Sequence, residues 1–168
     1  MNARSGDRAY HLTTTPMRKL SVNEVTEFLT SQGVSASPQC GRMLTDTAYY
    51  LPKRSWFVGS FAKTLQRFLS QLRLHRWVED KNDCDDSGQL GSFVGKLIHA
   101  LDDQTKDGGV AIGEWWYVRD LDGGMHSVPF AITTDEAGKL ELVFLEILHF
   151  KELKLSEGEI HSCMGLRL

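Results

Sequence analysis

The sequence predicts an α+β fold in a single domain, with N-terminal helices packed on a C-terminal antiparallel sheet. Three observations support this fold class. The chain has 168 residues, a length typical of one domain. Apolar residues recur at helical spacing up to residue 101, and after residue 109 the pattern alternates as it does in strands. Hydrophobic residues make up 41% and charged residues 24% of the chain, which is ordinary for a soluble domain and excludes a disordered chain or a disulfide scaffold.

Charge and cysteine content exclude further classes of protein. Nineteen Lys and Arg against 22 Asp and Glu give a net charge of -3, so we expect no nucleic-acid partner, which usually requires a basic surplus. The three cysteines are widely spaced and do not form a disulfide framework. No apolar run approaches the roughly 18 residues of a spanning helix, and residues 1–15 are too polar for a secretory signal. We therefore expect no membrane partner and a cytoplasmic site of synthesis, with later association with a virion left open.

The N-terminal region predicts an arm followed by a capped helix. Residues 1–20 are polar and contain a breaker ending at Pro16, so we expect a mobile arm there and a single domain over residues 21–168. Ser21 and Glu24 have the spacing of a capping box. Apolar residues then follow at helical spacing, and Gly33 is a suitable stop. This helix should cover a core with its apolar side.

Two further helices are predicted before residue 102. Residues 34–58 look irregular, and Ser60 is the expected cap of a helix with an apolar stripe that includes Phe61 and Leu65. The next helix should begin near Cys84. Three glycines on it, at 88, 91 and 95, each weaken a helix by about 1 kcal/mol relative to alanine. Small residues at this spacing predict that another backbone packs closely against the helix.

The strand-like segments come last. We expect strands over residues 110–118, 126–133 and 140–148, with a hairpin turn at residues 135–138 and a final strand within residues 159–168. The first of these strands contains three consecutive aromatic residues at positions 115–117. Because alternate strand residues point to opposite faces, at least one of these rings should lie in the core.

A candidate nucleophile lies at the predicted start of the third helix. Cys84 stands there, and a helix N-terminus stabilises a thiolate through its free N–H groups and its dipole. Asp85 and Asp86 follow immediately, and their charges oppose thiolate formation. The thiol therefore needs a partner base.

His126 is the candidate base. It opens a strand directly after a glycine-rich turn, so it can lie at the rim of the sheet beside the start of a packed helix. An imidazole there can take the thiol proton and return it to a leaving group. Glu146, which interrupts an apolar run on the neighbouring strand, is the best candidate to orient the imidazole, and Glu141 is a weaker one.

These residues resemble those of a papain-like cysteine peptidase group, which comprises small phage-encoded proteins and the C-terminal protease domains of fungal agglutinins. The group has a Tyr-Leu-Pro-like segment, an aromatic-rich helix, Asp-Cys-Asp-Asp-Phe-Ala, a glycine-preceded His strand and a hydrophobic-Glu-Pro strand. The counterparts here are Asp46 to Pro52, Trp77 to Glu79, Asp83 to Asp86, Gly124 to Ser127 and Phe144 to Glu146, within roughly residues 46–150. The resemblance implies a thiol protease, a hydrolase of the phage or prophage type, with Cys84 as nucleophile, His126 as general base and acid, and Glu146 as the orienting residue. A peptide or protein would be its substrate.

The departures from that pattern keep a second interpretation open. Ser87 and Gly88 replace Phe-Ala, and Ile147 replaces Pro. No glutamine stands at the position of the usual oxyanion donor, so Asn82 or a backbone N–H would have to serve. Losing one such donor typically costs about 10²–10³-fold in rate. The alternative is therefore an inactive papain-like module that acts as a structural or binding protein, for example alongside the proteins of a phage particle.

A second family fits in part. Cell-wall endopeptidases of the NlpC/P60 and CHAP types also carry Asp-Cys-Ser at a helix start and Gly-His on a strand. This similarity implies a peptidoglycan endopeptidase or amidase that acts on stem peptides. The aspartates after Cys84 favour the first group. Asp83, Asp85 and Asp86 are also candidate calcium ligands, with Glu146 or a carbonyl completing the site, and the agglutinin group points to the same cofactor.

Overall fold

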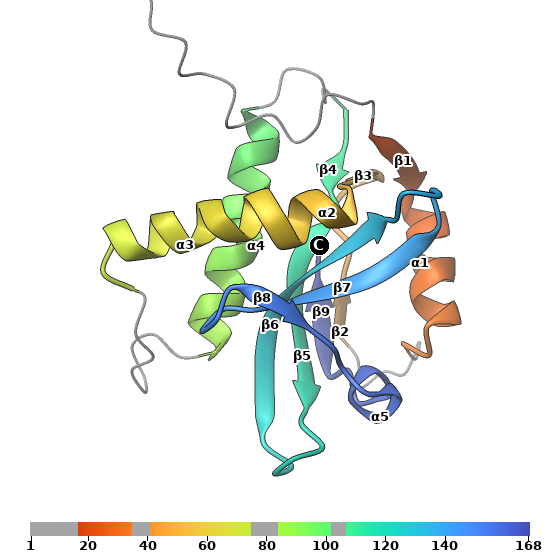
Figure 1. Cartoon of the computed structure of the whole chain (residues 1–168). Helices are drawn as coiled ribbons and strands as arrows, with labels where there is room; N and C mark the ends of the chain where they lie inside the picture. Colours follow the sequence, from red (N-terminus) through yellow and green to blue (C-terminus); the bar gives the residue numbers. More distant parts are fainter. Residues whose placement is uncertain (1–16, 35–40, 75–83, 102–106) are drawn as a thin grey trace, which may run out of the picture.

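The computed structural model describes residues 17–34, 41–74, 84–101 and 107–168 (Figure 1). These residues form one mixed α/β domain with two sheets, ordered β1-β3-β4 and β2-β9-β5-β6-β7-β8. The helical elements are α1 Val22–Ser31, α2 Arg54–Trp56, the π-helix η1 Phe57–Phe61, α3 Ala62–Gln71, α4 Cys84–Ala100 and α5 Glu157–His161. The strands are β1 Arg18–Ser21, β2 Gly41–Met43, β3 Ala48–Leu51, β4 Gly109–Val110, β5 Ile112–Val118, β6 Met125–Thr134, β7 Leu140–Glu146, β8 Lys151–Leu153 and β9 Gly165–Arg167.

The capped first helix is confirmed. Ser21 accepts a hydrogen bond from the Glu24 backbone N–H, and the Glu24 carboxylate accepts one from the Ser21 N–H. Gly33 has a φ of +81°, a conformation that side chains with a Cβ disfavour. The helix therefore begins and ends where the sequence indicates.

The N-terminal half contains strands that we did not expect. Residues 18–20 belong to β1, which pairs with β3, so the expected arm does not extend to residue 20. Residues 1–16 lie outside the described residues. The region 34–58, expected to be irregular, contributes β2 and β3 to two different sheets. Strands of three or four residues carry too little periodicity to be recognised in a sequence.

The second helix begins earlier than predicted. The helical segment starts at Arg54, and Ser60 lies inside η1 rather than capping α3. The prediction was wrong because it relied on a cap residue, whereas Phe57 and Phe61 are both buried and hold this segment in the core. The apolar stripe itself is confirmed, since Phe61, Leu65 and Leu69 are buried.

The central strands β5, β6 and β7 form the expected antiparallel meander. Tyr117 faces His126 across β5–β6, and Phe130 faces Phe144 across β6–β7. Gly138, with a φ of +82°, lies in the predicted hairpin turn. The large sheet is not wholly antiparallel, because β9 pairs in parallel with β2. The expected strand at residues 159–168 is in fact α5 followed by β9.

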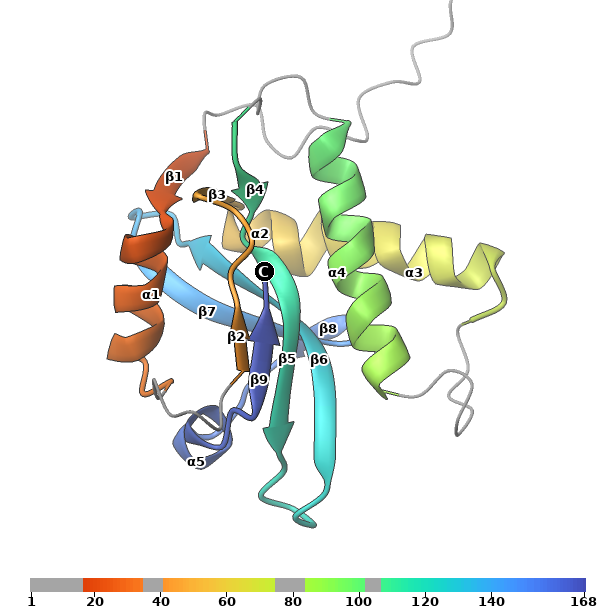
Figure 2. The same cartoon turned by 180° about the vertical axis from the view of Figure 1, so that it is seen from behind.

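Helical elements lie on both faces of the large sheet, which corrects the one-sided packing expected from the sequence (Figures 1 and 2). One apolar cluster joins α1 and the small sheet to one face and includes Val25, Trp115 and Phe130. The other joins η1, α3 and α4 to the opposite face. Trp115 has no exposed surface, which confirms the expected core ring.

The three glycines of α4 lie against the sheet, which confirms the predicted close packing. A Cβ added at Gly88 would lie 2.3 Å from Ser127 Oγ, and one added at Gly91 would lie 2.4 Å from Pro129 Cγ. Gly95 is similarly close to β5. Glycine is therefore required for α4 to approach β5 and β6. In the parts of the chain that are described, no helix is long and apolar enough to cross a membrane.

Candidate active site

His126 lies near the start of β6, directly opposite Tyr117 of β5. The two ring centroids are 5.7 Å apart and the ring planes are inclined at 73°, an edge-to-face contact. Because strand residues alternate, both rings lie on the face that carries Trp115 and Val128. A strand opening at a tight turn thus places the imidazole at the rim of the sheet, as the sequence predicted.

Glu146 ends β7 on the same face of the sheet. It is two residues beyond Phe144, which faces Phe130 of β6. The β6–β7 ladder ends at that pair, so among the described residues β6 has no β7 partner from Met125 to Pro129. The carboxylate accepts a hydrogen bond of 3.0 Å from the Leu148 N–H. His126 and Glu146 therefore flank an open stretch of β6.

Cys84 is the first described residue of α4, and its side chain is half-buried. One helical turn later, Gly88 touches Ser127 on the face of β6 opposite to His126. α4 therefore packs on the face of β6 opposite to the one that carries His126. The hydrogen bonds between described residues do not include one from Cys84 to His126, so any proton transfer between them requires a rearrangement or an intervening water.

Charged groups near the candidate site act on the pKa of Tyr117. Burial raises the pKa of the Tyr117 hydroxyl, and the charges of Glu159, Glu146 and Cys84 raise it further, while Arg119 acts in the opposite direction. Both the proposed nucleophile and the orienting acid are thus within electrostatic range of one phenol. Glu146 acts on both Tyr117 and His126, and Cys84 acts on Tyr117.

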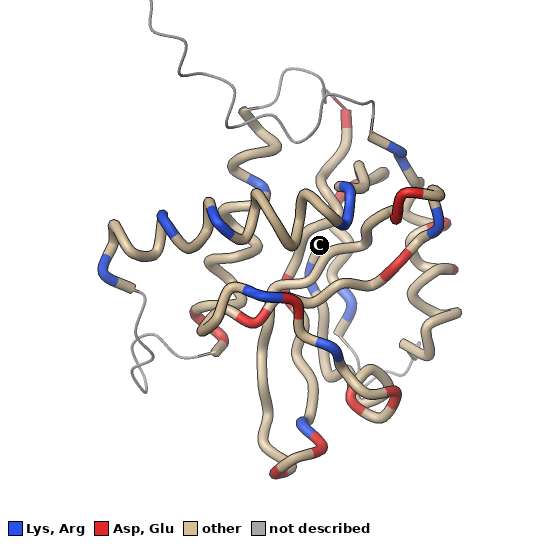
Figure 3. Tube along the Cα trace, viewed as in Figure 1, with Lys and Arg blue, Asp and Glu red and all other residues tan. Residues whose placement is uncertain are grey.

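The surroundings of His126 disfavour the charged form of its imidazole. Burial lowers the pKa of His126 from its usual 6.5, while Glu146 opposes that shift and Arg119 adds to it. A neutral imidazole has a free lone pair and can accept a proton from a thiol. Figure 3 shows acidic residues on the β5–β6 turn and on α5, near the same end of the sheet.

Two features of the site were missed by the sequence analysis. Tyr117 was noted only as a member of an aromatic cluster, and its pairing with His126 depends on the β5–β6 register. Glu114 lies inside the apolar segment of β5 with only 2% of its surface exposed, and Ser127 donates a hydrogen bond of 2.8 Å to it. An acidic residue within an otherwise apolar strand was the available signal.

The remaining site residues stay predictions. The oxyanion candidate Asn82 and the calcium candidate Asp83 lie outside the described residues. Within the described ranges, no group of three or more His, Cys, Asp or Glu side chains could hold a metal ion. The calcium set proposed from the sequence includes Asp83, so it is not tested by these residues.

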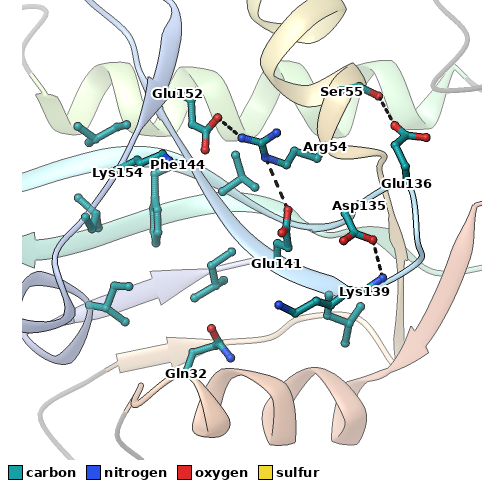
Figure 4. Close-up of a pocket in the computed structure, with 16 residues that line it drawn as sticks. Gln32, Arg54, Ser55, Asp135, Glu136, Lys139, Glu141, Phe144, Glu152 and Lys154 are labelled. Carbon is teal, nitrogen blue, oxygen red and sulfur yellow. Dashed lines mark hydrogen bonds and ion pairs between the residues drawn. The ribbon is translucent and has the colours of Figure 1, made fainter.

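A pocket of about 580 Å³ lies apart from these residues, between α1, β7, β8 and α5 (Figure 4). Its floor includes Leu142 and Phe144, and Arg54 forms ion pairs with Glu141 and Glu152 at its rim. Neither Cys84, His126 nor Glu146 lines it. Glu141, the weaker candidate for orienting the imidazole, forms its ion pair with Arg54 at the rim of this pocket.

No protein-family model matches the sequence, and no curated protein matches it. Solved structures do resemble it. One, described as "PSL1a-E64 complex", has a TM-score of 0.68 at 12% identity, over 89% of this chain and 51% of that chain. Another is a Polyporus squamosus lectin bound to a human-type influenza-binding epitope, Neu5Aca2-6Galb1-4GlcNAc, with a TM-score of 0.56 at 10% identity, over 89% of this chain and 49% of that chain. The chain thus spans about half the length of these structures, and at such low identity the likeness shows a shared fold alone.

Proposed function

We propose that this protein is a papain-like cysteine peptidase that cleaves amide bonds through Cys84, with His126 as general base and acid and Glu146 as the orienting residue. The observation that carries the proposal is the arrangement at one end of β6. His126 and Glu146 flank its open stretch on one face, and α4, which begins at Cys84, packs against Ser127 of the same stretch through Gly88. A thiol, an imidazole and a carboxylate are the groups that acyl transfer requires.

The chemistry assigns one task to each residue. His126 takes the proton from the Cys84 thiol, and the sulfur attacks the carbonyl carbon of the substrate amide. The tetrahedral intermediate collapses to a thioester as the C–N bond breaks, and the imidazolium gives its proton to the leaving amine. Water, deprotonated by His126, then hydrolyses the thioester and restores the thiol. Glu146 stabilises the orientation and the charge of the imidazolium.

The structural likeness supports this proposal at the level of the fold. The first of the similar structures is described as a complex with E64. The resemblance of the sequence to the protease domains of fungal agglutinins supports the same proposal. The glycan in the second structure is a ligand of that lectin.

The substrate class follows from the same resemblance. We propose a peptide or protein substrate, with a role related to phage or prophage biology. A peptidoglycan stem peptide is the runner-up substrate. A non-catalytic module that acts as a structural or binding protein is the other alternative.

Selective alkylation tests the proposal. Native protein would be treated with iodoacetamide between pH 4.5 and 9.5, and each cysteine would be followed by peptide mass spectrometry. We expect Cys84 to react with a midpoint below the roughly 8.5 of a free thiol, and His126→Ala to remove this advantage. Glu146→Gln should raise the midpoint by a smaller amount.

The controls are in the same chain. Cys163 is buried and should stay unreactive until the protein unfolds, and His149→Ala, which changes an exposed histidine on the β7–β8 connection, should leave the Cys84 profile unchanged. If the pH midpoint of Cys84 alkylation is the same in wild type and in His126→Ala, the result contradicts the proposal and favours the non-catalytic module. Two assays then separate the enzyme classes. Turnover of a fluorogenic peptide library indicates a peptidase that acts on peptides or proteins, whereas release of fragments from peptidoglycan indicates a cell-wall enzyme.

A further inference from the structure

The buried Glu114–Ser127 pair lies beneath the first turns of α4. Glu114 is 2% exposed and Ser127 is 3% exposed, and they share a hydrogen bond of 2.8 Å. A Cβ added at Gly88 would lie 2.3 Å from Ser127 Oγ and 3.0 Å from Glu114 Oε1. The helix backbone therefore rests directly on this polar pair.

The two elements that meet at the pair are those that carry the proposed nucleophile and base. Gly88 is one turn from Cys84, and Ser127 is next to His126 in β6. A shift of either partner moves α4 relative to β6. Such a shift changes the separation of thiol and imidazole, and misplacements of about 1 Å can cost 10²-fold in rate.

We propose that Glu114 is a positioning residue, which, through its hydrogen bond from Ser127 and its contact with Gly88, holds the Cys84 end of α4 against the strand that carries His126. The inference deepens the proposed function and rests on it for its catalytic meaning. The structural part of the inference, that the Glu114–Ser127 pair fixes the position of α4 on the sheet, does not depend on whether Cys84 is a nucleophile.

The surroundings of Glu114 make its carboxyl group costly to ionise. Burial raises the pKa of Glu114 to about 6, the Ser127 hydroxyl opposes this shift, Asp85 adds to it and Arg167 opposes it. Ser127 belongs to β6, Asp85 to α4 and Arg167 to β9, so each element packed around the carboxyl contributes one group. An acid that is costly to ionise in a core contributes little to stability at neutral pH, which indicates a positioning role.

Hydrogen exchange and thiol alkylation test the inference together. Exchange of the amides in residues 84–90 would be measured by mass spectrometry for the full chain and for Ser127→Ala, Glu114→Ala and Glu114→Gln. Loss of the hydrogen bond should raise exchange of this segment about tenfold in the two alanine variants. Glu114→Gln, whose amide oxygen still accepts from Ser127, should retain the protection. Should Glu114→Ala fail to fold, Ser127→Ala keeps the test decisive.

A matched control is available on the same strand. Thr133 of β6 is fully buried and its hydroxyl has no hydrogen-bond partner among the described residues, so Thr133→Val removes a buried hydroxyl without removing a hydrogen bond within this part of the chain. It should leave exchange of residues 84–90 unchanged. If Thr133→Val and Ser127→Ala have equal effects, or if neither changes the exchange, the inference is overturned.

The pH profile of Cys84 alkylation separates a positioning role from a purely structural one. Wild type should show an inflection near pH 6 that Glu114→Gln abolishes, and a profile without such a change would also overturn the inference. The inflection should persist in His126→Ala if Glu114 seats α4. Failure of the proposed function therefore appears as insensitivity of Cys84 to His126, whereas failure of this inference appears as insensitivity of Cys84 and of α4 exchange to Glu114.

Discussion

Tyr117 and His126 face each other across the β5–β6 ladder, with ring centroids 5.7 Å apart and planes inclined at 73°. The phenol shields one side of the imidazole from water, and burial is the main reason that the pKa of His126 is lowered. Tyr117 of the neighbouring strand therefore lowers the pKa of the proposed base by burying its imidazole.

Removal of the Tyr117 ring should expose the imidazole. In Tyr117→Leu, water reaches His126, and its pKa should rise towards the ordinary 6.5. Tyr117→Phe keeps the ring contact and should leave the pKa close to that of wild type. The measurement is a proton NMR titration of the histidine C2–H signals, with the exposed His149 as an internal reference. Equal shifts in both variants would contradict the shielding role.

The His126 pKa also predicts how stability depends on pH. A group whose folded-state pKa lies below its unfolded value binds fewer protons when folded, so its contribution is intact above the unfolded value of 6.5 and is lost as the pH falls through the lower folded value. We expect the free energy of unfolding of wild type relative to His126→Gln to decrease between pH 7.5 and 5. Urea denaturation at several pH values checks this. Parallel stability curves for wild type and His126→Gln would refute the expectation.

Glu114 predicts a pH dependence of the opposite sign. Its pKa is raised from 4.5 to about 6, so its contribution is intact below 4.5 and is lost as the pH rises through 6. The shift corresponds to about 2 kcal/mol at pH 8. Glu114→Gln should therefore be more stable than wild type by up to about 2 kcal/mol at pH 8 and nearly equal to it at pH 4.5. A constant difference across this range, measured by urea denaturation, would show that ionisation of Glu114 is not the cause.

Gly88 should tolerate no side chain. Alanine is favoured over glycine in a helix by about 1 kcal/mol, but a Cβ 2.3 Å from Ser127 Oγ forces α4 away from β6. Overpacking typically costs about 1–3 kcal/mol, so Gly88→Ala should be destabilising in urea denaturation. Gly59→Ala is the matched comparison, because a Cβ there meets nothing within 4 Å, and it should be neutral or stabilising. Stabilisation by both substitutions would be inconsistent with the packing described.

The predictable parts of the fold carry their signal locally. The capping box of Ser21 and Glu24, the glycine-spaced face of α4 and the β6–β7 hairpin each depend on residues close in sequence. The short strands β1, β2 and β3 were missed because they are held by partners far along the chain. Their residues alone have no periodicity that distinguishes them from a loop.

The residues of the candidate site could be proposed from the sequence, but their arrangement could not. Cys84, His126 and Glu146 have residue types and positions that point to acyl transfer, but their geometry depends on register and on the twist of the sheet. The role of Tyr117 follows from one pairing in β5–β6, and the burial of Glu114 follows from the contact with α4. Neither is encoded in a short motif.

The placement of β9 has a consequence for how the protein is made. β9 lies between β2 and β5, so β2 can join the large sheet only through residues 165–167. These residues are synthesised after all the other elements described. During translation, β2 and this edge of β5 stay unpaired until β9 emerges, and the contacts between β2 and β9 span more than a hundred residues. Long-range pairing of this kind slows folding and exposes strand edges, so a chain in which β9 is not yet paired is open to association through β5.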